Sequence, residues 1–72
     1  MRLVPVESSM ILAAGYDAAA KELEVVFGSG AVWRYQGVPR RVYRELLAAD
    51  SKGSYMRSCV IGVYPEYRLR RR

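Results

Sequence analysis

The sequence predicts a single α+β domain, in which a three-stranded antiparallel meander precedes two short helices packed on one face of the sheet (β-β-β-α-α). Three observations lead to this prediction. Hydrophobic and polar residues alternate in two stretches of the first half, which is typical of half-buried strands. Glycine-containing breaks separate these stretches. After Pro39 the spacing of hydrophobic residues changes to that of a helix.

The length and composition fit one small domain. The chain has 72 residues, of which 51% are hydrophobic, and a chain of this length buries only about 60% of its unfolded surface. We divide it into an irregular N-terminal segment (residues 1–8), the domain (residues 9–64) and a basic tail (residues 65–72) that we expect to be disordered. Because the sequence has no run of ~18 apolar residues and no secretory signal, we expect a cytoplasmic protein without membrane contact.

Three stretches of the first half are predicted strands, namely residues 9–16, 21–27 and 31–36. In the second, Leu23, Val25 and Phe27 alternate with two glutamates and a valine. Gly28-Ser29-Gly30 then forms a tight turn, because glycine accepts positive φ without steric cost. The first stretch is assigned as a strand because Gly15-Tyr16-Asp17 interrupts it.

The alternation of side chains assigns them to the two faces of the sheet. If the three-residue turn places residue 27 opposite residue 31, Val25 faces Trp33 and Leu23 faces Tyr35. A slip of one residue would separate the aromatic residues from the other hydrophobic ones, so the register should be firm. The predicted core face contains Met10, Leu12, Ala14, Leu23, Val25, Phe27, Trp33 and Tyr35, and the uncovered face carries Ile11, Val26 and Val32.

Two helices follow the sheet. Pro39 suits the first turn of a helix, where its missing N–H costs nothing. The first helix ends at Ala48-Ala49-Asp50, and Ser51 can cap the second, which stops before Gly62 and Pro65. The hydrophobic stripe of the first helix consists of Val42, Tyr43, Leu46 and Leu47.

The net charge of +5 is unevenly distributed. Residues 1–31 contain two basic and four acidic residues, a net charge of −2, whereas residues 32–72 contain ten basic and three acidic residues, a net charge of +7. This asymmetry favours an acidic partner, with nucleic acid as the first candidate; the alternative is a solvated surface with a solubilising tail. Arginine fits phosphate oxygens well, and the candidate phosphate-binding residues are Arg34, Arg40, Arg41, Arg44, Lys52, Arg57, Arg68, Arg70, Arg71 and Arg72.

Trp33 and Tyr35 have two interpretations. They could form a platform on which bases stack, an interaction worth roughly 1–3 kcal/mol per base. The register described above instead places both among the core residues under the helices, and we favour this second interpretation. A tyrosine hydroxyl at the rim of the core would be compatible with either.

The residue types indicate no catalytic or metal site. The sequence has no histidine, and Cys59 is its only cysteine, so we expect neither an internal disulfide nor a zinc site. Ser8 and Ser9 lack a histidine base to activate them, and we expect Ser9 at a strand start and Asp17 in a turn. Gly28-Ser29-Gly30 lacks the Lys-Ser/Thr end of a phosphate loop. We therefore expect no enzyme, no cofactor and no metal.

An ordered set of short motifs resembles the KTSC domain family, which is named after the C-terminal domain of some lysyl-tRNA synthetases and also occurs as small free-standing bacterial proteins. Trp33-Arg34-Tyr35 takes the place of the family's central Tyr-x-Tyr, and Met56-Arg57 replaces a Phe-Asn pair. The resemblance spans about residues 6–64, and its motifs are Ser8-Ser9, Gly15-Tyr16-Asp17, Trp33-Arg34-Tyr35, Val38-Pro39, Val42-Tyr43, Leu46 and Ser51-Lys52-Gly53-Ser54-Tyr55.

The resemblance implies no catalytic residues, and the association with a tRNA-charging enzyme implies RNA as the partner. We therefore expect a non-enzymatic module that binds RNA through backbone phosphates with low sequence selectivity. The alternative is a module for protein–protein interaction or homodimerisation, which would use the uncovered strip of Ile11, Val26 and Val32.

Overall fold

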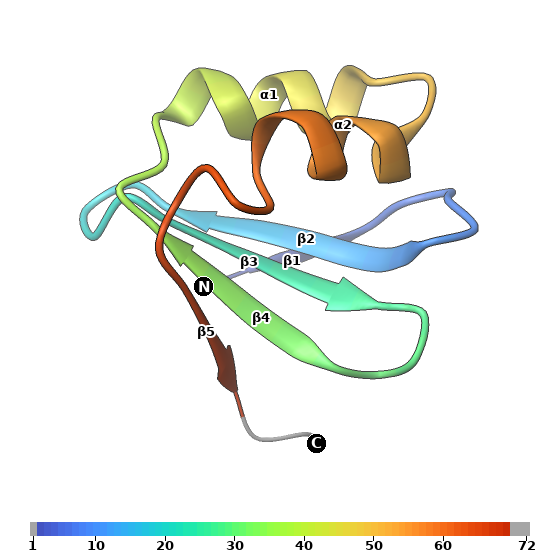
Figure 1. The fold of residues 1–72 in the computed structure, drawn as a ribbon, viewed down its shortest axis with the longest axis horizontal. Helices are drawn as coiled ribbons and strands as arrows, with labels where there is room; N and C mark the ends of the chain where they lie inside the picture. The colour runs from blue at the N-terminus through green and yellow to red at the C-terminus, as the bar shows by residue number, and fades with distance from the viewer. Residues whose placement is uncertain (1, 70–72) are drawn as a thin grey trace.

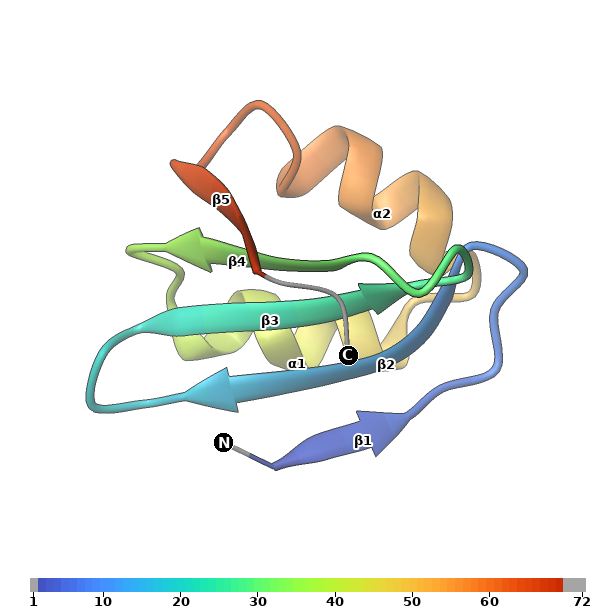
Figure 2. The ribbon, with the colours of Figure 1, turned by 90° about the horizontal axis from the view of Figure 1, so that it is seen from below.

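The computed structural model describes residues 2–69 as a five-stranded antiparallel sheet with two helices over one of its faces (Figure 1). The strands are β1 (Leu3–Pro5), β2 (Ile11–Asp17), β3 (Glu22–Phe27), β4 (Val32–Gln36) and β5 (Glu66–Leu69), and between the last two lie α1 (Arg40–Ala48) and α2 (Lys52–Cys59). The strands follow one another across the sheet in chain order. Figure 2 shows the face that no helix covers. Neither described helix is long and apolar enough to cross a bilayer.

The predicted α+β class, with two helices on one face of an antiparallel sheet, is confirmed, but the prediction of three strands is wrong. The N-terminal segment, predicted to be irregular, contains β1, in which Leu3 pairs with Gly15. The tail, predicted to be disordered, contains β5, which pairs with β4; Arg70–Arg72 lie outside the described residues. Strands of three and four residues are too short to show a clear alternation of hydrophobic and polar residues.

The β3–β4 hairpin has the predicted register. Val25 lies opposite Trp33, and both side chains face the helices. The turn is closed by a 2.9 Å hydrogen bond from the Phe27 N–H to the Ala31 carbonyl. Gly30 in this turn has a φ of 90°, which suits glycine because it has no Cβ. The turn therefore fixes the pairing that the sequence predicts.

Strand β2 has a β-bulge between Ile11 and Ala13, which the sequence does not predict. The extra residue reverses the alternation of faces, so Ile11 is fully buried and Leu12 is 52% exposed. The assignments of Leu12 to the core and Ile11 to the uncovered face are therefore wrong. Ala14, on the other side of the bulge, pairs with Val25 and is fully buried, so it keeps its predicted face.

The core lies between the sheet and the helices. Ser51 caps α2 as predicted, since its hydroxyl accepts a 3.3 Å hydrogen bond from the Ser54 N–H. Burying one aliphatic side chain contributes about 1.5–3 kcal/mol, so the buried cluster is what holds the helices on the sheet. Its members are Ile11, Ala14, Leu23, Val25, Tyr35, Val38, Val42, Leu46, Met56 and Val60.

Candidate nucleic-acid interface

Three arginines lie on the solvent side of α1. The buried residues of this helix face the core, and the helical spacing therefore turns Arg40, Arg41 and Arg44 outward, where all three are exposed. Arg41 lies 3.9 Å from a carboxylate oxygen of Glu45, but an exposed pair of this kind contributes about 0–1 kcal/mol. The guanidinium groups of α1 are thus accessible to a partner.

A shallow hollow of about 250 Å³ lies beside two of these arginines and is lined by Tyr16, Arg40, Tyr43 and Arg44. Tyr16 on β2 stacks with Tyr43 on α1, with ring centroids 5.5 Å apart and an interplanar angle of 15°. The Tyr16 hydroxyl donates a 2.6 Å hydrogen bond to the Val38 carbonyl, which fixes its ring beside the start of α1. We call this feature the tyrosine–arginine hollow; it combines two aromatic rings with two cations.

Arg34 lies on the sheet face that the helices do not cover and is occupied by contacts within the domain. Its Nε donates a 2.8 Å hydrogen bond to Oε1 of Glu24, and its Nη1 lies 3.5 Å from Oε1 of Glu22. The hydrogen bond with Glu24, followed by the interaction with Tyr67, raises the pKa of the guanidinium. Arg34, a candidate for phosphate binding, is therefore committed to internal ion pairs.

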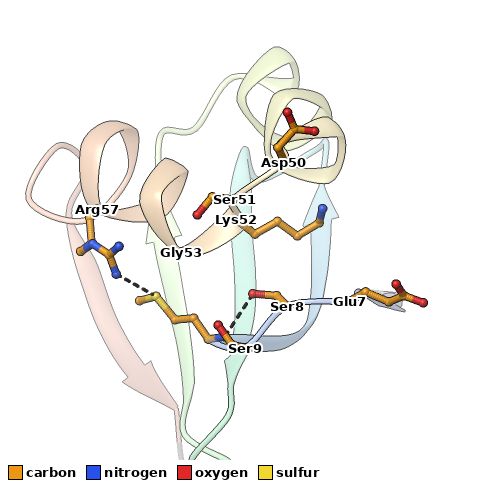
Figure 3. Close-up of a pocket in the computed structure, with 9 residues that line it drawn as sticks. Glu7, Ser8, Ser9, Asp50, Ser51, Lys52, Gly53 and Arg57 are labelled. Atoms are coloured by element: carbon orange, nitrogen blue, oxygen red, sulfur yellow. Dashed lines mark hydrogen bonds between the residues drawn. The ribbon is translucent and has the colours of Figure 1, made fainter.

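Lys52 and Arg57 line a second hollow of about 200 Å³, between the start of α2 and the segment before β2 (Figure 3). The Lys52 ammonium donates a 2.9 Å hydrogen bond to the Ala49 carbonyl. The two terminal nitrogens of Arg57 each have one long contact of 3.5 Å, to Met10 Sδ and to Ser54 Oγ. Arg57 is exposed and Lys52 half-buried, so Arg57 is the more accessible of these two candidates.

The second hollow is also the place where two motifs far apart in the sequence meet (Figure 3). The Ser8 hydroxyl accepts hydrogen bonds from the N–H groups of Met10 and Ile11, at 3.1 and 3.3 Å. Gly53 is buried in the first turn of α2, and a Cβ at this position would lie 2.9 Å from Met10 Sδ. Ser8 therefore shapes the entry into β2, and Gly53 permits the close approach of α2. Both motif positions have structural explanations.

Tyr35 is a core residue, as the favoured interpretation of the sequence predicts. It is 2% exposed, and burial, with a smaller contribution from the charge of Glu66, raises the pKa of its hydroxyl to about 12. Its ring therefore offers no open face to a base, which contradicts a stacking role. Trp33 is half-buried and lines, with Phe27, Ile61 and others, a third hollow of about 310 Å³.

The remaining predicted surfaces lie away from α1. Arg68 is exposed on β5, and Arg70–Arg72 lie outside the described residues. The strip predicted for protein interaction does not form as a whole, because Ile11 and Val32 are buried and Val26 is half-buried.

The proximity of Tyr16 and Tyr43 is not predicted from the sequence. Tyr16 belongs to the Gly15-Tyr16-Asp17 motif and Tyr43 to the hydrophobic stripe of α1, but their stacking depends on how α1 lies across β2. The sequence does indicate that Tyr43 reaches the helix surface. It lies between Arg40 and Arg44, at the edge of the hydrophobic stripe, where a residue is not wholly buried.

The fold and the site define a class of small domains in which an antiparallel sheet carries two helices on one face and exposes arginines on the first helix. The chain belongs to the KTSC domain family, whose model matches residues 7–64. The family resemblance of the sequence motifs is thereby confirmed.

Two bacterial relatives and one solved structure agree with this assignment. The chain is 48% identical over 56 residues to a protein of Tsukamurella paurometabola, covering 78% of this chain and 84% of that protein. It is 46% identical over 55 residues to an uncharacterized protein of Stutzerimonas stutzeri, covering 76% and 78% of the two chains. The crystal structure of the KTSC domain protein YPO2434 from Yersinia pestis matches with a TM-score of 0.93 and 32% identity, over 96% of this chain and 97% of that one.

Proposed function

We propose that this KTSC domain is a small, non-enzymatic, cytoplasmic module that binds RNA through its phosphates, with α1 as the main contact. The observation that carries the proposal is the exposure of Arg40, Arg41 and Arg44 on one short helix. A guanidinium offers paired N–H donors that match phosphate oxygens. Only the weak pair between Arg41 and Glu45 competes for these donors among the ion pairs of the described residues.

The distribution of charge supports an anionic partner. The half of the chain that contains both helices carries a net charge of +7, from ten basic and three acidic residues. Both helices lie over the same face of the sheet (Figure 1), so the exposed Arg57 of α2 belongs to the same layer as the arginines of α1. Contacts with phosphates fix a protein on RNA without reading its bases, and we therefore propose low sequence selectivity.

A titration of tRNA at several salt concentrations tests the proposal. If three or four phosphates are contacted, the logarithm of the binding constant should fall with the logarithm of salt concentration with a slope of roughly −2 to −3. The variant Arg40/Arg41/Arg44→Glu should lose this binding, because attraction at α1 becomes repulsion. Equal binding curves for the variant and the wild type would dismiss α1 as the site.

A control with the same change in net charge separates the α1 surface from a general effect of charge. Arg2, Lys21 and Arg68 are exposed and lie outside both helices. The variant Arg2/Lys21/Arg68→Glu should retain most of the affinity. If both triple variants lose binding equally, the attraction is a property of the whole molecule and not of α1.

Protein interaction or homodimerisation stays the alternative function. Among residues 2–69, the large hydrophobic side chains of Val4, Leu12 and Val63 are exposed. Light scattering distinguishes the two functions, because a dimer held by such residues would persist at high salt. A salt-insensitive dimer that does not bind RNA would favour the alternative.

A further inference from the structure

We infer that the tyrosine–arginine hollow receives an unpaired base of single-stranded RNA, while Arg40 and Arg44 hold the phosphates beside it. This inference rests on the proposed RNA binding and names the form of RNA that the site selects. It moves the stacking role away from Trp33 and Tyr35, the aromatic pair on β4, to the pair formed by Tyr16 and Tyr43.

The aromatic platform is already ordered in the free protein. The Tyr16 hydroxyl is bound to the Val38 carbonyl at 2.6 Å, and the Val38 N–H donates a 2.9 Å hydrogen bond to the Lys21 carbonyl. Tyr43 stacks on Tyr16, and both rings pack against the buried core. Because the rings are fixed, a base that stacks on them would lose little affinity to the ordering of side chains.

The charge around the platform suits a phosphate chain. Arg40 and Arg44 are one helical turn apart, with Cβ atoms about 5–6 Å from each other, and both are exposed. None of the described residues that line the hollow carries a carboxylate. The carboxylate of Asp17, which follows Tyr16, accepts hydrogen bonds from the N–H groups of Ala19 and Ala20 at 3.0 and 3.2 Å, and these contacts hold it within its own turn.

The combination of rings and arginines favours single strands over duplex RNA. In a duplex each base is stacked on its neighbours, so its faces are not available to a tyrosine, whereas an unpaired base can be splayed out and stacked on an aromatic side chain. Such stacking accepts any base, since every base has a π-face. An acidic peptide could use the two arginines but would have no need of the stacked rings.

The test compares two RNA probes and two variants of one residue. Fluorescence anisotropy measures the binding of a labelled oligouridylate and of a blunt RNA duplex of equal length. Tyr43→Leu removes the π-face but keeps an apolar side chain, and should weaken oligouridylate binding by roughly tenfold while leaving duplex binding unchanged. Tyr43→Phe, the matched control, should bind both probes like the wild type. Thermal melting of each variant checks that it is folded.

Photocrosslinking provides a second measurement that needs no variant. An oligonucleotide with 4-thiouridine is irradiated on the wild-type protein, and the crosslinked peptide is identified by mass spectrometry. We expect crosslinks at Tyr16 or Tyr43. Crosslinks at Trp33 instead would overturn the inference, whether or not Tyr43→Leu folds.

The outcomes also separate this inference from the proposed function. If the wild type binds duplex and single strand equally and Tyr43→Leu changes neither, the inference fails while RNA binding through α1 stands. If the wild type binds neither probe, both fail. If polyglutamate binds as tightly as oligouridylate and Tyr43→Leu weakens the binding of neither, the hollow recognises acidic chains in general and base stacking is refuted.

Discussion

Arg34 and Glu24 form an ion pair with an Nε–Oε1 distance of 2.8 Å on the sheet face that no helix covers. They occupy opposite positions on β4 and β3. The Glu24 side chain is 2% exposed, whereas that of Arg34 is 31% exposed, so a buried carboxylate is held by a guanidinium that still reaches water. The pair is therefore asymmetric, and replacement of Arg34 should destabilise the domain by a different amount than replacement of Glu24.

Arg34→Met should destabilise the domain more than Glu24→Gln. The first change leaves a buried carboxylate without its main partner, which costs about 3 kcal/mol. The second leaves a partly solvated guanidinium with a neutral acceptor, which costs about 1 kcal/mol. Urea denaturation measures both values. Arg68→Met, at an exposed position, is the control and should change stability by less than about 0.5 kcal/mol; equal losses for the first two variants would contradict the asymmetry.

Gly15→Ala should weaken the attachment of β1. A Cβ at this position would lie 2.5 Å from the Arg2 carbonyl oxygen and 3.1 Å from a methyl group of Leu3, so the backbone of β1 must move. We expect a loss of about 2 kcal/mol and faster hydrogen exchange in β1 and β2. Gly28→Ala is a matched control, because its Cβ would meet its nearest atom, the Met10 carbonyl oxygen, at an ordinary 3.5 Å. If Gly15→Ala were as stable as the wild type, β1 would not be packed closely against Gly15.

Stability should fall as the pH rises from 10 to 12, and Tyr35 should account for part of this fall. Burial raises the pKa of its hydroxyl from 10.0 to about 12 in the folded state. Between these values the unfolded chain has lost the proton and the folded chain has kept it, so the contribution of Tyr35 is complete below pH 10 and is lost toward pH 12. This contribution is about 2–3 kcal/mol. Tyr35→Phe should show a shallower decline in urea denaturation across this range, and parallel curves would contradict the prediction.

Removal of residues 66–72 should strongly destabilise the domain. The deletion removes β5, unpairs β4 and eliminates the 3.4 Å contact between the Tyr67 hydroxyl and Glu22. Loss of the apolar surface that the half-buried Tyr67 and Leu69 contribute would alone cost about 3 kcal/mol, which circular dichroism would record as a lower melting temperature. A chain that ends at Leu69 is the control, since it lacks three arginines and keeps the strand. Similar melting temperatures for both truncations would show that β5 is dispensable.

The sequence predicts those parts of the fold in which local chemistry determines the geometry. The glycine turn before Ala31 determines the pairing of β3 with β4, and Ser51 marks the start of α2. The bulge beside Leu12 could not be predicted, because it depends on which of two adjacent hydrophobic residues fits the core between the sheet and the helices. The strands β1 and β5 are stabilised by pairing with their neighbours, and their own sequences show too little alternation to identify them.

The candidate site was predicted only in part for a similar reason. The exposure of Arg40 and Arg44 could be predicted, because it follows from the hydrophobic stripe of α1, and this stripe can be identified from the sequence of that helix alone. The ion pair of Arg34 with the buried Glu24 depends on two strands, yet the predicted pairing of Val25 with Trp33 already places Glu24 opposite Arg34. That signal was present in the sequence. The stacking of Tyr16 on Tyr43 joins a strand to a helix, and no local pattern encodes it.

The edge strand β1 also limits the association of molecules of this protein through their sheets. The Val6 N–H donates a 3.0 Å hydrogen bond to the Leu12 carbonyl, so the backbone groups of Val6 point toward β2. Backbone groups point to opposite sides at alternate residues of an antiparallel strand. Those of Leu3 and Pro5 therefore point away from β2. Proline has no N–H, so within β1 only Leu3 offers an outward donor. An incoming strand would find one N–H donor beside the two carbonyl acceptors of Leu3 and Pro5, and this short, donor-poor edge therefore opposes the addition of further strands on the β1 side of the sheet.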